Sequence, residues 1–182
     1  MTGVLDMSAL RDAISATLKA KLPRVDVDAH GGTFDLDEVK RYAALAPAVR
    51  VALVGCGKAS RWNDGRWLVP VNIACVIFAR DAASADRSTI ISRDTAALAL
   101  ATSVQIVIQG NRFGLSGVRQ PEDVTARNEY SGALDATGAA LWQVNFTCGV
   151  LLGEAVDETL AALAQLYIIE DSGPRVLLEA PP

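Results

Sequence analysis

The stretch that decides the fold covers residues 48–80 and reads AVRVALVGCGKASRWNDGRWLVPVNIACVIFAR. Apolar residues alternate on both sides of Asn63-Asp64-Gly65, and this alternation is typical of strands. Glycine accepts the positive φ of a tight turn, so the Asp-Gly pair marks the place where the chain reverses. The sequence therefore predicts a long antiparallel hairpin with arms at residues 48–62 and 66–80.

The tip of this hairpin carries two arginines and two tryptophans: Arg61, Trp62, Arg66 and Trp67. One interpretation is a solvated turn whose indoles pack across the strands. The other is a contact surface, because tryptophan and arginine are enriched in binding hot spots. We favour the contact surface and treat these four residues as candidate interface residues.

Helices and a short strand are predicted before the hairpin. Leu10, Ile14, Leu18 and Leu22 recur every four positions, which predicts a helix over residues 6–22 with one apolar face. A strand follows at residues 24–28, with Asp26 and Asp28 on its wet side. A second helix starts at Asp35, where Glu38 completes a capping box, and ends before Pro47.

A third helix and a second hairpin are predicted after it. The helix fits residues 85–108, capped by Ser84 or Asp86, although residues 104–108 fit a strand equally well. Its inward residues would be Ile91, Leu98 and Ala101. After a loop at 110–117, an extended segment at 118–130 and an apolar strand at 140–152 would form the second hairpin through the connection 131–138.

The order of these elements indicates an α+β fold: an antiparallel-rich mixed sheet with long hairpins, flanked by helices. Its 182 residues, 51% of them hydrophobic, suffice for one domain, which we place at residues 1–153. Residues 154–182 look like a C-terminal arm that cannot bury its own apolar residues. The arm has a possible helical turn at 159–166 and ends with Val176, Leu177, Leu178 and two prolines, so the first three are further candidate interface residues.

The charge balance excludes two classes of protein. Seventeen Lys and Arg stand against 21 Asp and Glu, which gives a net charge of -4. A protein that tracks a nucleic-acid groove carries a basic excess, and so does one that binds a membrane surface. No apolar run reaches the roughly 20 residues of a spanning helix, and the first ten residues do not resemble a secretory signal.

The cysteines and the single histidine indicate neither a disulfide framework nor a metal site. Cys56, Cys75 and Cys148 are odd in number and far apart, in segments predicted as strands, where cysteine is usually a small buried residue. This usage fits a cytosolic origin. His30 lies beside Gly31-Gly32 in an expected loop, where a surface or turn role is favoured over catalysis. We expect no cofactor and no metal.

The segment Gly55-Cys56-Gly57-Lys58-Ala59-Ser60 resembles a phosphate-binding loop only faintly. That loop requires glycine where Ala52 stands and serine or threonine at Ala59, and it requires a helix afterwards. A glycine bulge in a long strand is the better interpretation. The carboxylate groups Asp35/Asp37/Glu38 and Glu122/Asp123 are expected to be solvated or to cap helices. No catalytic residue is therefore assigned, and a small nucleotide-binding enzyme is the least favoured alternative.

Residues 5–153 resemble the tail-completion, or tail-terminator, proteins of Mu-like phages and prophages in the order of their predicted elements and in several short sequence patterns. The resemblance rests on the first helix, which ends Leu18-Lys19-Ala20-Lys21-Leu22-Pro23, on the segment LAPAVRV at 45–51 and the hairpin after it, and on RNEY at 127–130 followed by ALWQV at 140–144. It implies a subunit of a six-fold ring without enzymatic activity.

Such a ring would cap the tail tube and join it to the head-tail connector or neck. The protein would be assembled in the host cytoplasm and located in the virion, and DNA would pass through the ring without specific binding. Its partners would be other copies of itself, the tube protein and a neck protein, with no membrane involved. Another neck, minor tail or baseplate adaptor protein is the alternative within the same particle.

Overall fold

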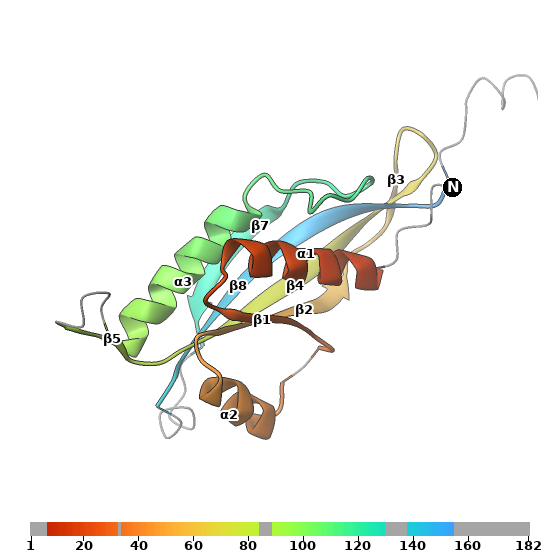
Figure 1. Cartoon of the computed structure of the whole chain (residues 1–182). Coiled ribbons are helices and arrows are strands. Elements are labelled where there is room, and N and C mark those ends of the chain that lie inside the picture. Colours follow the sequence, from red (N-terminus) through yellow and green to blue (C-terminus); the bar gives the residue numbers. More distant parts are fainter. Residues whose placement is uncertain (1–6, 33, 84–88, 130–137, 155–182) are drawn as a thin grey trace, which may run out of the picture.

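The computed structural model describes residues 7–32, 34–83, 89–129 and 138–154. It confirms the α+β class: one mixed sheet of six strands carries helices α1 and α3 on one face and α2 at the end of the other (Figure 1). Along the sheet the strands follow the order β1-β2-β4-β8-β7, and β3 also pairs with β4. The segment 155–182, with Val176, Leu177 and Leu178, lies outside the described residues.

The helices are α1 (Met7–Lys21), α2 (Leu36–Ala44) and α3 (Arg93–Ile108). The strands of the sheet are β1 (Asp26–His30), β2 (Ala48–Cys56), β3 (Ser60–Arg61), β4 (Trp67–Ala79), β7 (Glu122–Asn128) and β8 (Ala140–Leu152), and a separate two-stranded sheet joins β5 (Ala82–Ala83) to β6 (Ile90–Ile91). Within the described ranges, no helix is long and apolar enough to cross a membrane.

Both predicted hairpins are confirmed. Strand β4 pairs antiparallel with β2 on one side and with β8 on the other, from Trp67 opposite Leu152 to Ala79 opposite Ala140. Strand β7 pairs antiparallel with β8. The 13 residues of β4 span about 43 Å, and this long strand lies at the centre of the sheet.

The first strand lies two residues later than predicted. It runs parallel to β2, with Asp26 opposite Ala48 and His30 opposite Ala52. The backbone N–H of Asp26 donates to the carbonyl of Pro47 at 3.0 Å. The neighbouring strand therefore sets where β1 begins and ends, and local alternation alone does not contain that information.

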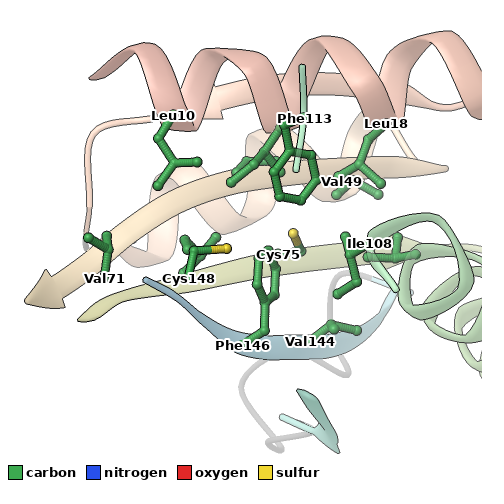
Figure 2. Packing of buried hydrophobic residues seen from close by; sticks show 14 of the residues in the cluster. Leu10, Leu18, Val49, Val71, Cys75, Ile108, Phe113, Val144, Phe146 and Cys148 are labelled. Atoms are coloured by element: carbon green, nitrogen blue, oxygen red, sulfur yellow. The ribbon is translucent and has the colours of Figure 1, made fainter. Parts of the chain in front are cut away.

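Helix α1 covers the sheet as predicted. Leu10, Ile14 and Leu18 are fully buried. Figure 2 shows Leu10 and Leu18 directed from α1 toward the sheet, in the same cluster as Cys75 and Phe146. The apolar face of the helix and one face of the sheet together form the main core.

Helix α3 begins at Arg93, eight residues later than predicted. Its N-cap is Ser92, whose hydroxyl accepts a hydrogen bond from the N–H of Thr95 at 3.3 Å, whereas Ser84 and Asp86 lie in the undescribed stretch 84–88. Residues 104–108 belong to the helix, so the strand alternative is wrong. Ala101 is buried as expected, but the inward placement of Leu98 and Ile91 is wrong, because both are exposed. Apolar residues occur around the whole helix and no charged residue follows Asp94, so its sequence does not reveal which side faces the core.

Helix α2 closes one end of the opposite face of the sheet. Its predicted capping box is present: the Asp35 carboxylate accepts from the N–H of Glu38 at 2.7 Å, and the Glu38 carboxylate accepts from the N–H of Asp35 at 3.4 Å. Val39 and Ala43 pack with Phe78 of β4 in a second apolar cluster. Among the residues that the structure describes, no other helix covers this face.

A buried arginine lies under α2. Arg50 is 4% exposed, and its guanidinium donates to the carboxylate of Asp26 and to the backbone carbonyls of Asp26 (2.8 Å) and Val49 (3.1 Å). The ring of Tyr42 lies over it at 4.4 Å. The carboxylate of Asp26 is half-exposed, which agrees with the predicted solvent-facing side of the strand. It also pairs with the buried guanidinium of Arg50.

Two of the three cysteines are buried as predicted. Burial raises the pKa of Cys75 and of Cys148 to about 12. The prediction is wrong for Cys56, the last residue of β2, which is exposed although its thiol donates to Sδ of Met7 in α1 at 3.4 Å. All three are free thiols.

Thiol labelling should distinguish these cysteines. At pH 8 the folded protein is expected to react with a thiol reagent at Cys56 alone, because Cys75 and Cys148 are inaccessible and remain protonated. The unfolded protein is expected to react at all three. Mass spectrometry of the labelled chain checks the result, and rapid labelling of Cys75 in the folded state would contradict the packing described above.

Candidate contact surface at the hairpin tip

The backbone of the hairpin tip forms a three-residue turn at 63–65. The N–H of Trp62 donates to the carbonyl of Arg66 at 2.8 Å, and the N–H of Gly65 donates to the carbonyl of Trp62 at 3.0 Å. Gly65 has a φ of 82°, the left-handed conformation that closes such a turn with little strain. The turn brings all four predicted tip residues to one end of the sheet, as expected from the sequence (Figure 1).

Arg61 and Trp67 lie opposite each other in the β3–β4 pair. The guanidinium of Arg61 lies 4.5 Å from the centroid of the Trp67 ring and donates to the carbonyl of Gly65 at 2.6 Å. The Trp67 residue is 45% exposed. A cation–π contact therefore orients this indole while leaving much of it accessible.

The second indole is covered by an arginine that the sequence does not point to. Arg119 lies in the loop after α3, and its guanidinium is 5.2 Å from the Trp62 ring. Two backbone hydrogen bonds hold this loop on β8: the N–H of Arg119 donates to Gly149, and that of Leu151 donates to Gly117, both at 2.8 Å. Only the tertiary fold brings Arg119 to Trp62, so no local signal could have identified it.

Arg66 is held by the aspartate of the turn. Its Nε and Nη2 lie 2.8 and 2.6 Å from Oδ2 of Asp64, and its backbone N–H donates to Oδ1 at 3.1 Å. The side-chain hydrogen bond with Arg66 lowers the pKa of Asp64, and the same bond with Asp64 raises the pKa of Arg66. The tip thus has three guanidinium groups, those of Arg61, Arg66 and Arg119, of which Arg66 is paired with Asp64 within the turn.

The Asp64–Arg66 contact predicts a specific pH response. A lowered pKa in the folded state means that this contact stabilises the turn above the usual titration range of aspartate and is lost as the pH falls through the lowered value. An NMR titration of the Asp64 carboxyl should give a midpoint below the usual range. Arg66→Ala should return the midpoint to that range, and an unchanged midpoint in this variant would contradict the assignment.

The last described residues of the chain lie beside this tip. Leu152, the last residue of β8, pairs with Trp67, and the description ends at Glu154. The tip residues and the end of β8 are therefore neighbours. The predicted interface residues of the arm, Val176, Leu177 and Leu178, lie outside the described residues.

The glycine-rich segment at 55–60 is part of the sheet edge. A register shift between Leu53 and Gly55 confirms the predicted bulge. The N–H of Gly57 donates to the carbonyl of Pro70 at 2.7 Å, and Ser60 begins strand β3 rather than a helix. The segment therefore does not have the geometry of a phosphate-binding loop, in which several unpaired backbone N–H groups point at the phosphate.

The expectation that His30 lies in a surface loop is wrong. It is the last residue of β1, its side chain is 9% exposed, and its ring stacks on Phe34 at 3.9 Å. Its Nε2 lies 3.4 Å from Oε1 of Glu38, and its Nδ1 faces the N–H of Gly32 at 3.2 Å. These contacts attach α2 to the sheet, so the histidine has a packing role.

No cluster of three or more His, Cys, Asp or Glu that could hold a metal ion occurs in the part of the chain that the structure describes. A scan against protein-family models finds no match for this chain, and a search of curated proteins finds none either. The hairpin tip is the best-formed candidate site that the geometry provides.

Proposed function

We propose that this chain is a structural subunit of a phage tail, a terminator that forms a ring, caps the tail tube and joins it to the head or neck. The observation that carries this proposal is the tip: two indoles with guanidinium groups over them, beside the end of β8. The four residues of this patch, Arg61, Trp62, Arg66 and Trp67, would contact the neighbouring protein.

The tip has the properties of a protein-binding hot spot. Tryptophan and arginine contribute the largest energies to interfaces, and they do so best when they are ordered before binding. Trp62 and Trp67 are each held by a cation, and Arg66 is held by Asp64. Little side-chain freedom would therefore be lost when a partner binds.

The resemblance to Mu-like tail-completion proteins supports the same function. It covers residues 5–153, and a sheet flanked by helices is the architecture that it implies. The six-fold ring, the tube protein and the head-tail connector or neck protein as partners follow from this resemblance. The protein would be located in the virion after assembly in the host cytoplasm.

The net charge of -4 agrees with a ring through which DNA passes. Acidic residues repel phosphates, so such a ring would not retain the DNA. The proposed role is structural, without an enzymatic activity, a cofactor or a membrane partner.

Two alternative functions differ in how well they agree with the geometry of the chain. Another neck, minor tail or baseplate adaptor protein would use the same tip, and only its place in the particle would differ. A small nucleotide-binding enzyme is less favoured, because the N–H of Gly57 is used by Pro70.

Disrupting the gene in the phage that carries it tests this function. Loss of a terminator should give tails of uncontrolled length that are not joined to heads, and the intact gene supplied in trans should restore both. Tails of normal length that are joined to heads would contradict the proposal. Tails that are joined but lack a baseplate would favour the adaptor alternative.

The arm is tested in the same complementation assay. We expect a chain that ends at Val156 to fold and to fail in joining heads to tails, because the arm would contact an adjacent ring or neck protein. Normal particles from this truncated chain would show that the arm is dispensable.

A further inference from the structure

The outer face of α3 is an uncharged surface with exposed apolar residues. Residues 95–110 contain no Asp, Glu, Lys or Arg. On the outer side Leu98 is 51% exposed and Ile106 is 66% exposed, and Ile90, just before the helix, is 80% exposed. Thr95 and Thr102 are exposed on the same side of the helix. Among the described residues, nothing covers this face.

A second surface, with a single charged residue among those lining it, lies on the opposite side of the sheet. A hollow of about 360 Å³ is lined by Ala52, Ala74, Val76 and Gln143, and it meets a second one of about 210 Å³ over Asn72, Asn145 and Thr147. Val54, which is 65% exposed, lines both. We call these two hollows the groove. The one charged residue among those lining it is Asp123, in β7.

Hydrogen bonds within the groove satisfy several of its polar groups. The Thr147 hydroxyl donates to the Asn72 amide oxygen at 3.1 Å, and the Gln143 amide donates to the Asn145 oxygen at 2.6 Å. The amide N–H groups of Asn72 and Asn145 are not used in these two bonds, so a surface that covers the groove must supply acceptors for them. Thr95 and Thr102, on the exposed side of α3, carry hydroxyl oxygens that can accept such bonds.

The width of the groove is close to that of one helix. The groove crosses β2, β4 and β8, and two strand spacings amount to about 10 Å, close to the diameter of a helix. The 16 residues of α3 extend about 24 Å. The sheet separates α3 from the groove of its own chain, so α3 can reach only the groove of another copy.

We propose that α3 of one copy lies in the groove of the next copy. Because the two surfaces lie on opposite faces of one sheet, the contact is head-to-tail, and repeated head-to-tail contacts close into rings or extend as filaments. A symmetric contact between two α3 helices would leave the groove and Val54 exposed. This contact would join the subunits of the proposed ring, and in that sense it rests on the proposed function.

Charge substitutions on either surface test the contact. The purified full chain should form oligomers in sedimentation experiments, and Leu98→Glu or Ile106→Glu should weaken the association at least about a hundredfold, because a carboxylate would be buried without a partner. Val54→Glu should act in the same way from the groove side. Ala16→Glu, at an exposed position of α1, is the matched control and should leave the association unchanged. A chain that stays monomeric up to millimolar concentration would overturn the proposal.

Cross-linking between two variants tests the direction of the contact. Cys56→Ser removes the exposed native thiol. In this background, chains with Leu98→Cys or Ile106→Cys are mixed with chains carrying Val54→Cys and oxidised. The expected product is a disulfide between the two kinds of chain from at least one α3 position. Cross-links only within the α3 variants would show a symmetric contact and overturn the proposal, as would no cross-link.

These outcomes are separate from those for the proposed function. If the chain forms head-to-tail oligomers but is absent from phage particles, the contact between α3 and the groove holds and the role in the tail is refuted. If the chain forms a ring in the particle through other surfaces, the proposed function holds and the contact between α3 and the groove is refuted.

Discussion

Replacing Trp62, Arg66 and Trp67 together with alanine is expected to leave the chain folded and to abolish the joining of heads to tails. Each hot-spot residue contributes about 2 kcal/mol or more to an interface, so three losses should weaken binding by far more than a hundredfold. The fold should survive, because none of the three belongs to the buried core. Joining is measured by mixing heads with tails that carry the variant and counting complete particles by electron microscopy.

A matched variant separates the tip from a general surface effect. Lys19 and Leu45 are also exposed, and they lie on other elements, at the end of α1 and after α2. Lys19→Ala with Leu45→Ala should leave joining unchanged, and circular dichroism should show native secondary structure in both variants. If the triple variant joins as well as the natural chain, the tip is not the contact surface.

Asp26→Ala is expected to destabilise the fold by about 2–4 kcal/mol. Removing one partner of a buried ion pair usually costs about 3–5 kcal/mol, and the half-exposed carboxylate of Asp26 lowers this value. The guanidinium of Arg50 would stay buried beside Tyr42 with only carbonyl partners. Chemical denaturation measures the change in the free energy of unfolding.

Two further variants test the cause of this loss. Asp28→Ala removes an exposed carboxylate from the same strand and should cost well under about 1 kcal/mol. Combining Asp26→Ala with Arg50→Met removes both charges and should recover much of the lost stability, because an apolar side chain then replaces the unpaired cation. A double variant less stable than Asp26→Ala would show that the buried charge is not the cause.

Local patterns were sufficient to predict most of the elements. The turn at Asn63-Asp64-Gly65 located the large hairpin, and the apolar run at 140–152 gave β8 with its observed bounds. The spacing of Leu10, Ile14 and Leu18 predicted α1 and its buried face. Each of these signals lies within a few residues along the chain, where sequence periodicity is informative.

The remaining features depend on contacts between distant segments. The bounds of β1 follow from pairing with β2, and the burial of Arg50 follows from α2 covering that end of the sheet. The side of α3 that is buried could not be predicted, because residues 95–110 carry no charge that would mark the outer side.

The candidate site was predictable only in part. The turn chemistry brings Arg61, Trp62, Arg66 and Trp67 together, and this could be expected from the sequence. The stacking of Arg119 on Trp62 depends on how the loop after α3 packs against β8.

Cryo-electron microscopy of the intact phage particle, with this chain tagged at its N-terminus, tests the central claim most directly. We predict a six-fold ring of this chain between the end of the tail tube and the neck, with the hairpin tips in contact with a neighbouring protein. A particle whose head-tail junction lacks the chain, or a chain found only outside particles, would contradict the proposed function.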